Sequence, residues 1–150
     1  MKKIVSYMMT GILLLSFLLT GCGSPEPQTG KKMSMYYINT AETKVEVHEQ
    51  YLNTKTLDEQ LDETMRYLST TPEKLEYKAP LDMGFRVLDY EVEDGKLLIN
   101  VDKAYSELSP TTEVLVRAAI VRTLTQLPNV KYVGITVEDS QLYDNAGEMV

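Results

Sequence analysis

Few residues of this chain have the types and spacing that chemistry requires. Asp89, Glu91 and Glu93 could form a carboxylate cluster for metal binding or general-acid catalysis. They alternate with other residues at a spacing of two, however, and the solvated face of a β-strand explains them better. His48 is the single histidine, without a second histidine to share a metal, and we expect a solvated strand residue. We therefore predict no catalytic residue, no metal site and no cofactor.

The single cysteine, Cys22, stands at the end of an apolar segment near the start of the chain. Lys2 and Lys3 precede this segment, whose densest part is ILLLSFLL, and this order is typical of a signal peptide. A membrane span needs about 20 predominantly apolar residues, so the alternative of an uncleaved membrane helix is less favoured. The small and polar stretch GSPEPQTGKK follows. We expect residues 1–21 to be a signal peptide and residues 22–33 a flexible tether.

The four residues Leu19, Thr20, Gly21 and Cys22 resemble the lipobox of bacterial lipoproteins. The resemblance implies cleavage between Gly21 and Cys22, and attachment of a diacylglyceryl group, with fatty acids such as palmitate, to the Cys22 sulfur. Two acyl chains anchor a protein stably, whereas one binds only marginally. We therefore expect an extracytoplasmic protein, anchored by its N-terminal lipid to the outer leaflet of the cell membrane.

Charge and length limit the possible partners. The chain of 150 residues has 15 Lys and Arg against 22 Asp and Glu, a net charge of −7. Removing residues 1–21 takes away Lys2 and Lys3 and no acidic residue, so the remainder carries −9. Such a body repels nucleic acid, and its length suits one domain, which we assign to residues 34–150.

The first half of this domain shows two strand patterns and a helix. Residues 33–39 and 44–52 are strand-like, and in the second of these Val45 and Val47 are expected on the buried face. Thr56 and Glu59 have the spacing of a capping box, and Pro72 should end the helix that follows. Its apolar stripe comprises Leu57, Leu61, Met65 and Leu68. Residues 73–84 are expected to be mostly loop.

The second half begins with a β-hairpin. Asp94-Gly95 is a two-residue turn signal, and pairing Glu93 with Lys96 also sets Leu88 opposite Val101. A last strand is expected in residues 130–139.

A second helix is predicted from Ser109 and Pro110 to about Leu127. It has two apolar faces, so it should contact both a sheet and the first helix. Leu115 lies outside both faces, and we expect it to be a partner-binding residue if the first helix leaves it uncovered. The alternative, equally favoured, is that Leu115 is ordinary core.

The elements together predict an α+β fold in the order β-β-α-β-β-α-β. Helices that alternate with a hairpin and single strands indicate a two-layer sandwich, with both helices on one face of a mixed sheet.

The segments DGKLLINVDKAYSEL (94–108) and AIVRTLTQLPNVKYVGITVED (119–139) resemble the GerMN, or sporulation and spore germination, domain family. Thr123, Leu124, Thr125, Pro128 and Val130 stand in its T-L-T-x-x-P-x-V-like segment, while residues 137–139 lack the usual glycine. The resemblance covers residues 35–150 and implies a non-enzymatic domain of envelope complexes. Residues 57–138 also have the αββαβ order of ring-building motifs. Family members usually continue with another strand, so we expect a truncation near residue 150.

From these features we expect a lipid-anchored module that binds envelope proteins or further copies of itself, associated through the resemblance with sporulation or germination. A cell-wall or small-ligand binding module is the alternative, and a carboxylate-dependent hydrolase is less favoured. A partner module should expose an apolar patch, whereas a ligand binder should have a concave pocket with convergent polar groups.

The lipobox resemblance predicts acylation at Cys22. We expect the chain, expressed in a bacterium supplied with labelled fatty acid, to incorporate the label, and Cys22→Ala to lose it, because the thioether requires the sulfur. Labelled protein is detected on a gel. Label that persists in Cys22→Ala would contradict the assignment.

Overall fold

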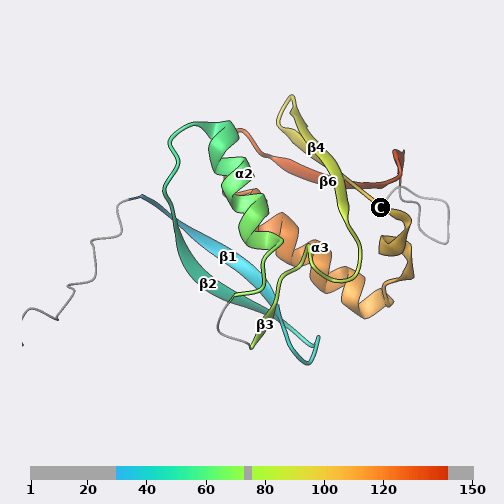
Figure 1. Cartoon of the computed structure of the whole chain (residues 1–150). Coiled ribbons are helices and arrows are strands. Elements are labelled where there is room, and N and C mark those ends of the chain that lie inside the picture. The colour runs from blue at the N-terminus through green and yellow to red at the C-terminus, as the bar shows by residue number, and fades with distance from the viewer. Residues whose placement is uncertain (1–29, 73–75, 142–150) are drawn as a thin grey trace, which may run out of the picture.

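The computed structural model describes residues 30–72 and 76–141, and the chain has an α+β fold (Figure 1). The predicted signal peptide and lipobox, including Cys22, lie outside the described residues. The elements are β1 (Lys31–Asn39), β2 (Val45–Leu52), α2 (Leu57–Leu68), β3 (Tyr77–Lys78), β4 (Val87–Glu93), β5 (Lys96–Val101), the 3₁₀ helix η2 (Lys103–Glu107), α3 (Pro110–Leu124), β6 (Tyr132–Val137) and β7 (Ser140–Gln141). This is the predicted order, with β3, η2 and β7 added.

The strands form two sheets, whereas the sequence pattern predicts one. The first is antiparallel, with the order β2-β1-β3, and the second has the order β4-β5-β6-β7, in which β5 and β6 are parallel. Helix α3 contacts β1 of the first sheet and β6 of the second, so both sheets enclose a common core. β3 lies in the predicted loop, because a two-residue strand carries no periodic signal.

Helix α2 begins with the predicted capping box. The Thr56 hydroxyl accepts from the Glu59 N–H (3.4 Å), and the Glu59 carboxylate accepts from the Thr56 N–H (3.2 Å). Leu61, Met65 and Leu68 of the predicted stripe are buried, and Leu57 is half-buried. The helix ends at Leu68, ahead of Pro72.

The hairpin of β4 and β5 has the predicted turn. Asp94 and Gly95 both have positive φ, +49° and +85°, as a type I′ turn requires, and Glu93 pairs with Lys96. The predicted pairing of Leu88 with Val101 is wrong, because a β-bulge shifts the register and sets Val87 opposite Val101. Leu88 is consequently 49% exposed.

Helix α3 starts as predicted, with the Ser109 hydroxyl accepting from the Thr112 N–H (3.2 Å) and Pro110 at its first position. Its regular hydrogen bonding ends at Leu124, earlier than predicted, and the chain continues in turns. The predicted core face is buried: Val116, Ile120, Leu124 and Leu127. The other apolar face is only partly covered: Val114 is 64% exposed, and Ala118 and Val121 are half-buried.

The end of α3 closes one edge of β1. β3 pairs with β1 only at Ile38 and Asn39, so the preceding backbone groups on that edge have no strand beside them. The Tyr36 N–H donates to Thr123 Oγ1 (3.0 Å). The Gln126 side-chain amide accepts from the Ser34 N–H (3.0 Å) and donates to the Ser34 carbonyl (2.7 Å), as a neighbouring strand would.

We predict that Thr123→Val destabilises the fold by about 1–3 kcal/mol, because the substitution keeps the shape but leaves the Tyr36 N–H without its acceptor. Thr125→Val is the matched control, since Thr125 is exposed and its hydroxyl bonds only within α3. Urea unfolding measures both. Equal midpoints for the two variants would contradict the role of Thr123.

Candidate functional site

Strand β2 turns two of its polar side chains, His48 and Gln50, toward the interior. His48 pairs with Met35 and Gln50 with Met33, and both methionines are buried. Cross-strand partners share one face of a sheet, so His48 and Gln50 lie on the core side. Val47 points the other way and is 55% exposed, so its predicted burial is wrong. Alternation shows which residues of a strand share a face, and the more apolar face is then predicted to be buried. Here the more polar face is the inner one, because it lines a pocket.

This pocket, which we call the tyrosine pocket, has a volume of about 500 Å³ and lies between the first sheet and the end of α2. It is lined by Tyr37, His48, Gln50, Tyr67, Thr70, Thr71, Pro72 and Tyr77. None of these lining residues is Asp, Glu, Lys or Arg. His48, expected to be a solvated strand residue, is half-buried in its wall.

Tyr37 forms the buried base of the pocket. Its side chain is 3% exposed, its ring stacks on Tyr77 with centroids 6.1 Å apart, and its hydroxyl donates to the Tyr67 carbonyl (3.4 Å). Burial, with a smaller contribution from the neighbouring Tyr67, raises the pKa of Tyr37 to about 12. The phenol therefore stays neutral throughout the physiological range.

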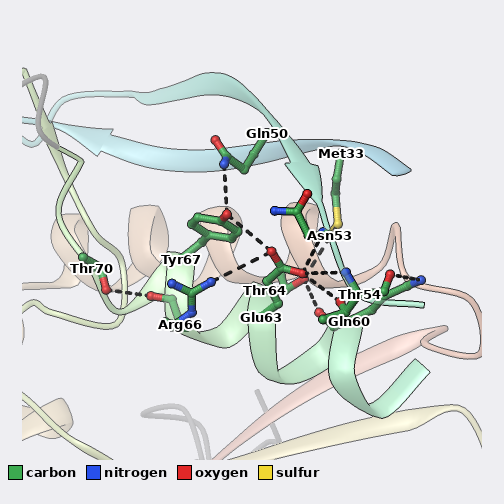
Figure 2. A network of polar contacts seen from close by, with 10 residues as sticks. All are labelled: Met33, Gln50, Asn53, Thr54, Gln60, Glu63, Thr64, Arg66, Tyr67 and Thr70. Carbon is green, nitrogen blue, oxygen red and sulfur yellow. Dashed lines mark hydrogen bonds and ion pairs between the residues drawn. The ribbon is translucent and has the colours of Figure 1, made fainter. Parts of the chain in front are cut away.

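A polar network behind the pocket holds Tyr67 and Gln50 in place (Figure 2). Gln50 Nε2 donates to the Tyr67 hydroxyl (3.0 Å), which donates to Glu63 Oε1 (3.4 Å). Glu63 is only 7% exposed. Its other oxygen accepts from the N–H groups of Asn53 (3.0 Å) and Thr54 (3.2 Å) and from the Thr54 hydroxyl (2.7 Å). A buried carboxylate with this many donors can orient its neighbours without being exposed itself.

The three carboxylates singled out in the sequence do not converge on a site. Asp89, Glu91 and Glu93 are exposed along β4, which confirms the interpretation as a solvated strand face. The buried Asn100 donates to Asp89 (3.1 Å) and to Asp139 (2.7 Å), and this ties β5 to β4 and to the turn after β6. Over residues 30–72 and 76–141, no group of three or more His, Cys, Asp or Glu could hold a metal ion.

Helix α3 carries an exposed apolar surface. Leu115, the candidate partner residue, is half-buried and packs against the core. Val114, Ala118 and Val121 line a shallow depression of about 370 Å³ with Glu113 and Arg117. The Arg117 guanidinium donates to the Glu113 carboxylate at the border of this surface. We call Val114, Ala118 and Val121 the α3 strip.

Leu19, Thr20, Gly21 and Cys22 lie outside the described residues. Within the part of the chain that the structure describes, no helix is long and apolar enough to cross a membrane. β1 begins at Lys31, three residues before the domain boundary expected from the sequence.

A family model matches most of this chain. Residues 34–143 match the Germane family, described as sporulation and spore germination. No curated protein matches the chain.

Two solved structures share the fold. The tandem GerMN domains of the sporulation protein GerM from Bacillus subtilis are 19% identical, with a TM-score of 0.55, and the match covers 87% of this chain and 47% of that one. The first GerMN domain of the same protein is 15% identical, with a TM-score of 0.58, over 79% of this chain and 92% of that one. This chain thus spans about half the length of the tandem structure. At these identities the likeness shows the fold alone.

The raised pKa of Tyr37 predicts a loss of stability at alkaline pH. Its folded value of about 12 lies above the ordinary 10.0, so the stabilisation is fully present below pH 10 and is lost as the pH rises through 12. We expect the free energy of unfolding of Tyr37→Phe to fall less over this range, by about 2 kcal/mol. Tyr132→Phe, at an exposed position, is the control. Urea unfolding at each pH tests this, and parallel pH profiles for all three proteins would contradict it.

Proposed function

The chain belongs to the Germane family of sporulation and spore germination, and from this premise we propose that it is a lipid-anchored, extracytoplasmic module that assembles envelope proteins without catalysing a reaction. Its partner is an envelope protein or a second copy of the chain, met at the outer surface of the cell membrane. The proposal rests on family membership, on the lipobox-like residues ending at Cys22, and on the exposed face of α3.

The α3 strip is the observation that carries the proposal. Val114 is 64% exposed, although α3 is otherwise packed against both sheets. The Glu113–Arg117 pair borders the apolar centre with polar groups, the usual arrangement of a protein interface. Leu115 does not line this depression; it is half-buried and packs against the core, so only its exposed part is available to a partner. Because Val114 is 64% exposed, covering the rest of it is worth about 1–2 kcal/mol.

A lipid at Cys22 would keep this surface close to the membrane. Eight residues lie between Cys22 and Lys31, where β1 begins, and an extended chain over these nine residue-to-residue steps spans at most about 30 Å. The net charge of −9 on residues 22–150 also disfavours contact with anionic headgroups. A domain that is tethered to the membrane but repelled by its headgroups stays in the thin layer above the bilayer. This raises its effective concentration for partners in the same layer.

The tyrosine pocket favours a second candidate function, ligand binding. The third, a carboxylate-dependent hydrolase, finds little support, since the candidate carboxylates lie apart from the pocket on an exposed strand.

We predict that a photo-crosslinking amino acid at position 118 of the anchored chain gives a discrete adduct with an envelope protein or a second copy. Val114→Asp should reduce the adduct at least tenfold, since it places a charge in the apolar centre of the surface. Val47→Asp is the control, because Val47 is comparably exposed on a different element. Urea unfolding checks that both variants remain folded, and mass spectrometry identifies the adduct. No adduct, or one insensitive to Val114→Asp, would contradict the proposal.

Leu115→Asp tests whether Leu115 contributes to the interface or belongs to the core alone. If Leu115 belongs to the core alone, the variant unfolds at lower urea and its residual folded fraction crosslinks normally. If it contributes to the interface, the folded fraction also loses the adduct.

A further inference from the structure

The inverted strand β2 points to a second functional site. A strand that exposes Val47 while turning His48 and Gln50 inward contradicts the ordinary pattern, and such local conflicts concentrate at functional sites. Gln50 uses one amide hydrogen on the Tyr67 hydroxyl. Within residues 30–72 and 76–141, its carbonyl oxygen and the two His48 ring nitrogens make no hydrogen bond to the protein. These polar atoms face the tyrosine pocket with capacity to bind a ligand.

The walls of the pocket are aromatic. Tyr67 and Tyr77 are half-buried, so part of each ring faces the pocket, and Tyr37 supports Tyr77 from behind by stacking. An aromatic ring offers a flat apolar face with a polar tip, which suits a ligand that has both a flat C–H face and hydroxyl groups at its edges.

The absence of charge among the described lining residues narrows the ligand class. Within residues 30–72 and 76–141, the lining offers a phosphate or carboxylate no Lys or Arg. The nearby Arg66 guanidinium lies 5.0 Å from the centroid of the Tyr67 ring and 3.9 Å from Glu63, and it does not line the pocket. A purely apolar ligand would leave His48 and Gln50 desolvated and unpaired, which is costly. A neutral ring with several hydroxyls avoids both penalties, and about 500 Å³ lies within the usual range of ligand sites.

We propose that the tyrosine pocket binds a neutral saccharide, with sugar rings against Tyr67 and Tyr77 and sugar hydroxyls hydrogen-bonded to His48 and Gln50. This site is separate from the α3 strip. It is formed by the first sheet and the end of α2, and it shares no lining residue with the depression on α3. A test of saccharide binding can therefore fail without contradicting the proposed protein interface, and the reverse also holds.

The single histidine allows a direct test. In the full chain held in detergent, the imidazole proton resonances of His48 are a unique NMR reporter inside the pocket. We expect chitotriose or cellotriose to shift these resonances saturably at concentrations up to roughly 10 mM, and trigalacturonate, which carries charge, to bind at least tenfold more weakly. The two neutral probes distinguish an N-acetylated from an unmodified sugar.

Variants of Tyr77 assign the binding to the aromatic wall. Tyr77→Leu should lower the affinity for the sugar at least tenfold, whereas Tyr77→Phe keeps the ring and should retain most of the affinity. Tyr132→Leu, at a 68% exposed position on β6, is the control, and Val114→Asp should leave sugar binding unchanged. No saturable shift with either neutral probe would overturn the proposal, as would equal binding of trigalacturonate or a folded Tyr77→Leu with full affinity.

Discussion

The unpaired edge of β1 is the constraint on which the rest of the fold depends. β1 has a full partner in β2 on one side, but β3 covers only its last two residues on the other. Buried backbone groups must find partners, and here Thr123 and Gln126 supply them from the end of α3. This fixes α3 along β1, and α3 in turn packs on β6, so the two sheets share one core. The first threonine of the T-L-T-x-x-P-x-V-like segment thus has a structural reason, because its hydroxyl accepts the hydrogen bond of a strand edge.

Polar residues of helix α2 make the second connection between the two sheets. Glu63 accepts from the chain just after β2, and Asp62 accepts from the Tyr90 hydroxyl of β4 (2.8 Å). Two adjacent acidic residues in the middle of α2, Asp62 and Glu63, therefore fix the position of the helix. Because Tyr67 donates to Glu63 from the next turn, the same attachment sets the wall of the tyrosine pocket.

Local sequence signals predicted the helices and strands well, but they could not predict features that depend on residues far apart in the chain. The capping box of Thr56 and the turn at Asp94-Gly95 were predictable because each needs only a few neighbouring residues. The bulge beside Leu88 was not, since alternation continues through it in the sequence while the pairing shifts in space. The inward turn of His48 and Gln50 was also hidden. A polar strand face is predicted from the sequence to be exposed to solvent. Only the position of α2 in the structure shows that the face with His48 and Gln50 lines a pocket.

The position of the two proposed surfaces has a thermodynamic consequence. The tyrosine pocket is built by β1, β2, β3 and the end of α2, whereas the α3 strip lies on another helix. Coupling between two sites requires an element whose arrangement both ligands change, and α3, held to β1 by Thr123 and Gln126, lines the depression but not the tyrosine pocket. Binding at the two surfaces should then be additive in free energy. If Cys22 carries the proposed lipid, a tether of about 30 Å would make additive weak contacts sufficient, because the first contact raises the effective concentration for the second. A lipid-held domain of this kind can thus combine a modest saccharide affinity with a modest protein affinity into stable retention at one place on the envelope.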